Sequence, residues 1–299
     1  MSFLKWLLGG KKDSSRAHMS TAPLDPRAIP SYLHIEGRRH ILVGSAHSAG
    51  MERSHDDDSL LVIVGGADGD KGLPDFGLFC VADGLGGYEC GHIASAVAVR
   101  TIAHRLTQGA FLRLLEIEPS EEDQPLDELV SRAFEEANQA VFKRAAGGAT
   151  TLTAALMLGD QLVIGHVGDT RAYSIRDGGI ECLTLDHSLV QQLIETGAIN
   201  EEEALDSPHR SVLWNAMGKN ENLKVDITSH TVTPGSCLLL CSDGLWGVIS
   251  EEEITNIISE VIGPQMACEK LVQAANEAGG PDNVTAILIK FPFEVGIPL

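Results

Sequence analysis

Aspartates at the ends of apolar runs are the residues of this sequence best suited to chemistry. Asp83 follows the run FGLFCVA, Asp169 follows LVIGHVG, Asp243 follows CLLLCS, and Asp282 precedes NVTAILI. Three of the four adjoin a glycine, which lets the backbone turn sharply and leaves room for a ligand close to the main chain. Taken singly, an aspartate beside a glycine is an ordinary turn. Their recurrence predicts that acids from distant parts of the chain meet at one place.

A second group of acids, Asp56, Asp57 and Asp58, stands before another apolar run at 60–64. Carboxylates that converge in a partly buried site repel one another, and hard divalent cations such as Mg²⁺ or Mn²⁺ relieve that repulsion. A soft-metal site built on histidine fits less well, because the candidate histidines show no i,i+4 pairing among themselves. These histidines are His47, His55, His166, His187 and His230. The pattern therefore predicts a centre with oxygen ligands.

Strands and helices alternate in blocks along the chain. Apolar runs of strand length cover residues 41–46, 60–64, 76–81, 151–158, 161–167, 171–176, 181–185, 223–229, 237–241 and 284–290. Helical patterns cover 93–101, 126–141, a stretch from 250 onward and 264–279, and a broken helical pattern covers 187–218. Blocks of strands with helix pairs between them predict two packed antiparallel sheets with helices outside, an α+β fold. We expect residues 187–218 to form a mobile flap.

Three segments are expected along the chain. A flexible N-terminal tail covers 1–36, one folded domain covers 37–293, and a short C-terminal tail covers 294–299. The opening residues 1–12, MSFLKWLLGGKK, combine apolar side chains with three lysines. This composition predicts weak docking on an anionic membrane or a partner, with a frayed tail as the alternative. No run approaches the roughly 20 apolar residues of a membrane span.

Charge and cysteine usage narrow the function. The formal net charge of −20 argues against a nucleic-acid partner, because phosphate backbones are bound by clustered lysine and arginine. The six cysteines are scattered, mostly inside apolar runs, and form no CxxC pair. We therefore expect reduced thiols in a cytoplasmic protein. We also expect the protein to be a monomer.

Seven short motifs, in their order along the chain, resemble the metal-dependent protein phosphatases of the 2C type, bacterial branch. They are Arg53-Ser-His-Asp-Asp-Asp58, Val81-Ala-Asp-Gly-Leu-Gly-Gly87, Gly148-Ala-Thr-Thr151, His166-Val-Gly-Asp-Thr-Arg171, Leu185-Asp-His-Ser188, Cys241-Ser-Asp-Gly-Leu-Trp-Gly247 and Gly280-Pro-Asp-Asn-Val-Thr285. Each motif is weak alone, but together they span about residues 40–291. The resemblance implies a central antiparallel β-sandwich flanked by pairs of antiparallel helices, in α/β/β/α layers, with a two-metal centre at one edge.

The resemblance also implies ligands for two core ions, Mn²⁺ or Mg²⁺. Asp83 would bridge both ions, and Gly84 would offer its backbone carbonyl to one of them. Asp243 and Asp282 would complete the coordination of the other ion.

Three further roles follow from the same resemblance. Asp58 would act mainly through metal-bound waters, and Asp169 would join Asp243 at a third, weaker metal site. Arg53 would grip the substrate phosphate, a role suited to its planar fork of donors. The alternative for Arg53 is a surface ion pair with the neighbouring run of aspartates.

The sequence departs from the family pattern at a few positions. Asp56 and Asp57 replace the common Asn and Glu of the first motif, and Thr170 replaces the usual Ser after Asp169. Leu85 stands where eukaryotic members often carry a histidine proposed as the general acid. The residue that protonates the leaving group is thus unassigned.

The resemblance implies a protein serine/threonine phosphatase that hydrolyses phosphoserine and phosphothreonine monoesters through a metal-activated bridging hydroxide. The expected partners are phosphorylated proteins, together with a cognate Ser/Thr kinase and its substrates. The alternative is a catalytically weak regulatory or binding module on the phosphatase fold, whose mark would be loss of the metal aspartates. A third reading is a dedicated switch acting on one anti-sigma antagonist or secretion component.

Overall fold

The computed structural model describes residues 41–67, 73–86, 90–116, 124–200, 203 and 207–292. The tails predicted for 1–36 and 294–299, and the docking role predicted for 1–12, lie outside the described residues. Within the described ranges, no helix is both long enough and apolar enough to cross a bilayer.

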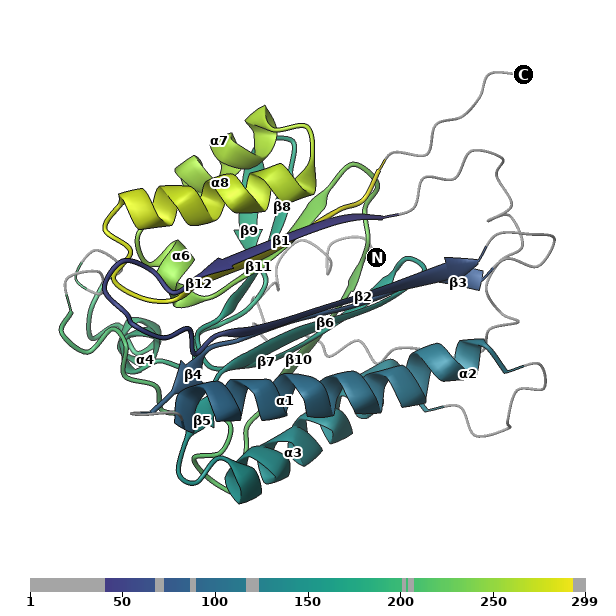
Figure 1. Ribbon diagram of the computed structural model, residues 1–299, viewed down its shortest axis with the longest axis horizontal. Coiled ribbons are helices and arrows are strands. Elements are labelled where there is room, and N and C mark those ends of the chain that lie inside the picture. The colour runs from purple at the N-terminus through teal and green to yellow at the C-terminus, as the bar shows by residue number, and fades with distance from the viewer. Residues whose placement is uncertain are drawn as a thin grey trace, which may run out of the picture.

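Two five-stranded antiparallel sheets form the centre of the molecule (Figure 1). The first sheet has the order β1 (Leu42–Ser48), β12 (Val284–Lys290), β11 (Cys237–Cys241), β8 (Arg171–Arg176), β9 (Gly179–Cys182). The second has the order β10 (Asp226–Thr231), β7 (Gln161–Val167), β6 (Leu152–Leu158), β3 (Leu73–Ala82), β2 (Ser59–Ala67). A small sheet pairs β4 (Gly84–Leu85) with β5 (Ala149–Thr150).

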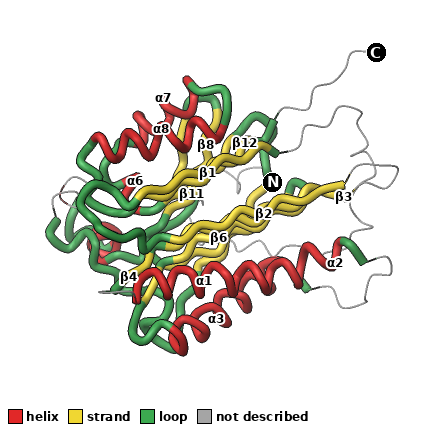
Figure 2. The backbone as a smooth tube through the Cα atoms, viewed as in Figure 1, coloured by secondary structure: helices red, strands yellow, loops and turns green. Residues whose placement is uncertain are grey.

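Helices cover the outer face of each sheet. The second sheet is covered by α1 (Cys90–Leu106) and α3 (Leu126–Arg144), and the first by α7 (Glu251–Glu260) and α8 (Pro264–Glu277). The sheets face each other through apolar side chains such as Phe79, Leu240 and Ile287. Figure 2 shows the layers, with strands inside and helices outside. The remaining short elements are η2 (Thr107–Phe111), α2 (Leu112–Leu114), α4 (Leu189–Glu195) and α6 (Asp243–Trp246).

Local sequence signals fix several element boundaries. Asp177 and Gly178 join β8 to β9 with φ values of 51° and 78°, the left-handed backbone that a two-residue hairpin requires. Ser250 is the N-cap of α7, and its side-chain oxygen accepts a hydrogen bond from the Glu253 amide at 3.2 Å. Pro264 occupies the first turn of α8, where its missing N–H costs no helical bond.

The segment 187–218 departs from its predicted helical pattern. Helix α4 forms its first part, but the described residues 207–218 follow turns and bends. The Trp214 amide donates to the His187 carbonyl at 3.0 Å, and the Met217 amide donates to the Thr150 carbonyl at 2.8 Å. The first bond joins the two ends of the segment and the second joins it to Thr150, so these backbone groups have non-helical partners and the local helical periodicity is overridden.

Two predicted strands also shift along the chain. The strand predicted at 181–185 ends at Cys182, and Thr184 accepts from the Ala172 amide with its side-chain oxygen at 3.2 Å. The strand predicted at 223–229 begins later, at Asp226, and ends at Thr231. The Asn215 side-chain amide donates to the Lys224 carbonyl at 2.7 Å, so this carbonyl is not available for strand pairing. In both places a side chain replaces a backbone partner in the ladder.

Candidate metal centre

The strand ends that carry the aspartates meet at one end of the sandwich, where Figure 1 labels β4 and α6. Asp58 precedes β2 and Asp83 follows β3, and these strands are antiparallel neighbours. Asp243 follows β11 and Asp282 precedes β12, which are neighbours in the other sheet. Asp169 lies in the turn from β7 to β8, which crosses between the sheets. Antiparallel pairing sets the end of one strand beside the start of the next, so all five aspartates gather there.

Asp83 lies at the electrostatic centre of this aspartate cluster. Burial raises the pKa of Asp83 well above its usual range, and the charges of four other aspartates raise it further: Asp58, Asp243, Asp169 and Asp282. Burial likewise raises the pKa of Asp169 well above its usual range, with the charge of Asp243 as the next cause. Like charges held in a desolvated site disfavour ionisation unless a cation is present.

Two oxygens of the cluster are buried without a hydrogen-bond partner. Burial raises the pKa of Asp58 to about 7, although its Oδ2 accepts from the Ser242 hydroxyl at 2.8 Å. The nearby Thr285 hydroxyl offsets part of this rise, but within the described residues Oδ1 of Asp58 accepts no hydrogen bond of standard geometry, and neither does Oδ1 of Asp243. The pKa of Asp243 is raised as well, first by burial and then by the charge of Asp282. Buried acceptors left unpaired are rare in proteins, and each needs an explanation.

The donor set of this site fits a hard cation. Carboxylate and carbonyl oxygens are the ligands that Mg²⁺ and Mn²⁺ prefer, and two carboxylate oxygens lack a partner. In the described part of the chain, no three His, Cys, Asp or Glu side chains already have a geometry that would hold a metal ion.

The backbone after Asp83 is fixed by tight packing. The Asp83 carbonyl accepts from the Thr151 amide at 2.9 Å and from the Thr150 hydroxyl at 2.8 Å. At Gly84, a Cβ atom would lie 2.4 Å from the Gly91 carbonyl oxygen, so any other residue would displace the start of α1. The Gly84 carbonyl oxygen itself lies 2.9 Å from the point where a Cβ on Gly91 would sit.

Arg53 reaches into the cluster from a loop. Its Nη2 lies 2.8 Å from Oδ2 of Asp282, while 57% of the arginine side chain remains exposed. The charge of Asp282 raises the pKa of Arg53, followed by a hydrogen bond to the same residue. The ion pair is therefore made with Asp282, 229 positions along the chain, rather than with the neighbouring run of aspartates.

Asn283 organises the loop and was given no role in the sequence analysis. Its Oδ1 accepts from the Asp57 amide at 2.8 Å, and its Nδ2 donates to the carbonyls of Ala49 and His55 at 3.0 and 2.8 Å. The residue is 5% exposed and follows Asp282 directly. It ties the loop that carries Arg53 to the turn that carries Asp282. The only sequence signal was its place in the motif Gly280-Pro-Asp-Asn-Val-Thr285.

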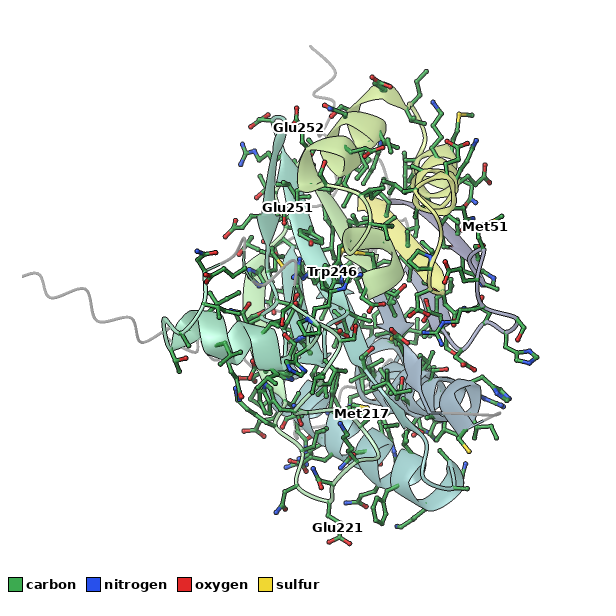
Figure 3. The ribbon with its side chains drawn as sticks, turned by 90° about the vertical axis from the view of Figure 1, so that its left-hand side faces the viewer. Met51, Met217, Glu221, Trp246, Glu251 and Glu252 are labelled. Atoms are coloured by element: carbon green, nitrogen blue, oxygen red, sulfur yellow. The ribbon has the colours of Figure 1, made fainter. Side chains whose placement is uncertain are left out.

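A second polar group, which we call the Arg171 network, adjoins the aspartates. Arg171 makes two bonds to the Asp186 carboxylate, at 3.0 and 2.8 Å, and a third to the Tyr173 hydroxyl at 3.0 Å. Its guanidinium carbon lies 3.6 Å from the ring centroid of Trp246. The indole N–H of Trp246 donates to the Asp169 carbonyl at 3.0 Å. Figure 3, which looks onto this end of the molecule, shows Trp246 near its middle.

The segment 187–218 is attached to the second sheet by buried polar side chains. His187, 1% exposed, lies with its Nε2 3.1 Å from Oδ2 of Asp226, and its Nδ1 accepts from the Gly168 amide at 3.2 Å. The hydrogen bond from His187 lowers the pKa of Asp226 to about 2. The neighbouring His166 is buried too, and burial lowers its pKa to about 3, so both rings serve structure rather than metal ligation.

Comparison with known proteins identifies the family. The family described as "Protein phosphatase 2C" matches residues 57–277. The serine/threonine phosphatase stp of Listeria welshimeri is 32% identical over 216 residues, which cover 70% of this chain and 82% of that protein. The serine/threonine protein phosphatase PstP of Mycobacterium tuberculosis is 32% identical over 222 residues, covering 71% of this chain and 40% of the longer relative.

Solved structures agree with the sequence comparison. The crystal structure of the Mycobacterium tuberculosis phosphatase PstP/Ppp has a TM-score of 0.69 at 29% identity, covering 84% of this chain and 99% of that one. The catalytic domain of PstP in complex with two manganese ions has a TM-score of 0.67 at 28% identity, covering 84% and 97%. These matches confirm the predicted α+β sandwich and the predicted metal-dependent phosphatase. The chain belongs to the protein phosphatase 2C family.

Proposed function

We propose that the aspartate cluster is the catalytic centre at which this chain removes phosphate from phosphoserine and phosphothreonine in proteins. The chain is a protein serine/threonine phosphatase that uses Mn²⁺ or Mg²⁺, as its family and its named relatives indicate. One observation carries the location of the centre. Asp83 is half-buried among four other carboxylates, while one buried oxygen of Asp58 and one of Asp243 have no hydrogen-bond partner in the described residues.

The proposed ligands follow from this arrangement. Asp83, the Gly84 carbonyl, Asp243 and Asp282 would hold two core ions, with Asp58 acting through water. Asp169 and Asp243 would hold a third, weaker ion. When bound there, the divalent ions supply a nucleophilic water at neutral pH and positive charge opposite the phosphoryl oxygens.

Arg53 is proposed to orient the substrate phosphate. Its guanidinium now neutralises Asp282 at 2.8 Å, at the entrance to the cluster. With Asp282 engaged as a metal ligand, the Arg53 guanidinium fork would be free to match two phosphate oxygens in a bidentate way. The Asn283 bonds to the loop backbone keep Arg53 close enough to Asp282 for this exchange.

We further propose that the protein acts as a cytoplasmic monomer opposite a Ser/Thr kinase. All six cysteines are free, and burial raises the pKa of the Cys80, Cys241 and Cys268 thiols, which suits a reducing compartment. The kinase follows from the substrate class, since each phosphoserine or phosphothreonine is the product of a kinase. No observation favours a non-catalytic binding module, because every predicted metal aspartate lies in the cluster.

The test compares metal dependence with single carboxylate changes. Hydrolysis of p-nitrophenyl phosphate and of a phosphothreonine peptide is measured with Mn²⁺, Mg²⁺ or EDTA in wild type, Asp83→Asn and Asp243→Asn. We expect turnover with metal only, and a loss of about a thousandfold or more in both variants, because cation charge stabilisation is worth several kcal/mol.

The matched control is Asp177→Asn, in the exposed turn between β8 and β9, where asparagine tolerates the left-handed backbone. This variant should hydrolyse both substrates at the wild-type rate. Turnover that survives EDTA and both cluster substitutions would show that the centre lies elsewhere.

A further inference from the structure

A groove of about 540 Å³ opens beside the aspartate cluster, between the end of β1 and helix α8. We call it the α8 groove. Its walls include His47 and Met51 on one side and a single face of α8 on the other. The α8 residues that matter here are Glu269, Val272, Asn276 and Glu277. Val272, Asn276 and Glu277 lie three, seven and eight positions after Glu269, which places all four along one helical stripe.

The α8 groove shares a wall with the catalytic centre. The Met51 amide donates to the Gly280 carbonyl at 2.7 Å, which ties the loop to the turn before Asp282. Two residues further along this loop, Arg53 contacts Asp282 at 2.8 Å. Figure 3 shows Met51 at the edge of the molecule, beside the pale yellow helix α8. A polypeptide whose phosphate sits at Arg53 can leave the cluster over Met51 and enter the groove.

Within the described residues, the groove carries negative charge that no lysine or arginine balances. Glu269 accepts from the Gln265 side-chain amide at 2.9 Å, and Glu277 accepts from Gln273 at 2.7 Å, but both donors are neutral. Among the described residues that line the groove, His47 is the only one with a basic side chain, and it contacts Asp56 at 2.6 Å. A cationic occupant therefore complements this surface, within a chain whose net charge is already −20.

The space between the two glutamates is apolar and adaptable. Met51 is 69% exposed, and its flexible side chain can repack around a neighbour. Its Cγ and the Asn276 Oδ1 lie 2.9 and 3.0 Å from the point where a Cβ on Gly280 would sit. This Oδ1 is buried and has no hydrogen-bond partner among the described residues.

The separation of the glutamates sets a length for the occupant. Glu269 and Glu277 are eight positions apart, which is about 12 Å along a helix. An extended peptide rises about 3.3 Å per residue, so the same distance corresponds to three or four residues.

We propose that the α8 groove binds the segment of the substrate protein next to the phosphorylated residue. It selects segments with two Lys or Arg residues three or four positions apart and an apolar side chain between them. This inference rests on the proposed function of the cluster, and it adds the class of phosphoprotein that the enzyme prefers.

The experiment measures kcat/KM of the full chain on matched phosphothreonine peptides. In the first set, two lysines stand four positions apart with a leucine between them, and this pair lies either before or after the phosphothreonine. In the second set, glutamates replace the two lysines. The test variant is Glu269→Gln with Glu277→Gln. The control is Glu251→Gln with Glu252→Gln on α7, two exposed glutamates that Figure 3 shows away from Met51. Hydrolysis of p-nitrophenyl phosphate reports the centre alone.

We expect wild type to prefer one of the lysine peptides, and the preference to shrink at high salt. The test variant should lose about fourfold in kcat/KM on that peptide through a higher KM, because each exposed ion pair contributes a factor of about two. Its hydrolysis of p-nitrophenyl phosphate should be unchanged, and the control should keep the wild-type preference.

Three results would overturn the inference. The first is an equal kcat/KM of wild type for the lysine and the glutamate peptides. The second is a loss of kcat/KM in the α7 control as large as that in the test variant. The third is a wild-type dimer that dissociates in the test variant, which would make a second copy of the chain the occupant of the groove. A wild type that hydrolyses neither p-nitrophenyl phosphate nor any peptide would instead refute the proposed function. The wild-type peptide preference decides the inference even where a variant folds poorly.

Discussion

The aspartate cluster and the Arg171 network are both buried and polar, and they lie side by side, yet their charges are arranged in opposite ways. In the Arg171 network, the guanidinium meets the Asp186 carboxylate with two bonds at 3.0 and 2.8 Å. In the cluster, four carboxylates raise the pKa of Asp83, and two buried oxygens have no partner in the described residues. Buried charge that is matched within the chain serves structure, and buried charge left unmatched marks a place for a ligand.

The two regions are also mechanically connected. Trp246 lies on α6, three positions after Asp243, and its indole donates to the Asp169 carbonyl at 3.0 Å. Arg171 packs on the face of the same indole at 3.6 Å. The satisfied network therefore holds the loops of the unsatisfied cluster in place, because carboxylates that repel one another cannot do so themselves.

The largest expected effect comes from breaking the matched region. Asp186→Ala leaves the Arg171 charge buried without its carboxylate, and we expect a loss of about 3–5 kcal/mol in the free energy of unfolding. Urea denaturation in EDTA measures this loss. The matched control is Arg176→Ala, whose pair with Asp177 is exposed, and it should cost less than about 1 kcal/mol. Equal losses in the two variants would remove the distinction between the regions.

The next effect tests the unmatched region by supplying the missing charge. Mn²⁺ at about one hundred times its dissociation constant should raise the free energy of unfolding of wild type by about 2.7 kcal/mol. Asp83→Asn should abolish most of that gain, because it removes the carboxylate at the centre of the cluster. In EDTA the variant should be at least as stable as wild type, since one repelling charge has gone. Thermal melts with and without Mn²⁺ provide the measurement, and equal metal stabilisation of both proteins would contradict the proposal.

The last comparison concerns the sign of the pH dependence of stability in metal-free protein, rather than its size. The folded pKa of Asp58 is about 7, above its unfolded value of about 4, so the folded state keeps a proton that the unfolded state loses. The contribution of Asp58 to stability therefore falls as pH rises from about 4 to about 7. Asp226 is the opposite case, because the His187 hydrogen bond lowers its folded pKa to about 2. Its contribution is present above about pH 4 and is lost as pH falls from about 4 to about 2.

Urea denaturation across pH separates the two contributions. Asp58→Asn should remove part of the decline between about pH 4 and 7, to which the other raised aspartates also contribute, and Asp226→Asn should remove part of the decline below about pH 4. Slopes of the same sign for the two sites would mean that the regions do not differ in the way we describe.

Much of the fold could be predicted from local patterns. The strands β7, β8, β11 and β12 coincide with predicted apolar runs, because each run is bounded by turn residues that end it. The prediction was wrong for most of the described part of 187–218, where the Trp214 amide bonds to His187 at the start of the segment and the Met217 amide bonds to Thr150 outside it. Periodicity within a segment carries no information about such partners.

The sequence by itself determined which residues could do the chemistry and that they stand at strand ends, because residue type and hydrophobic pattern are local properties. It did not determine that Arg53 pairs with Asp282, that Asn283 holds the intervening loop, or that Arg171 lies between Asp186 and Trp246. The tertiary structure decided these contacts. Arg53 and Asp282, like Asn283 and the loop it holds, are more than 200 positions apart and meet only when the strands have assembled. Burial acts in the same way, since an aspartate acquires a raised pKa only after the packed sandwich has removed it from water.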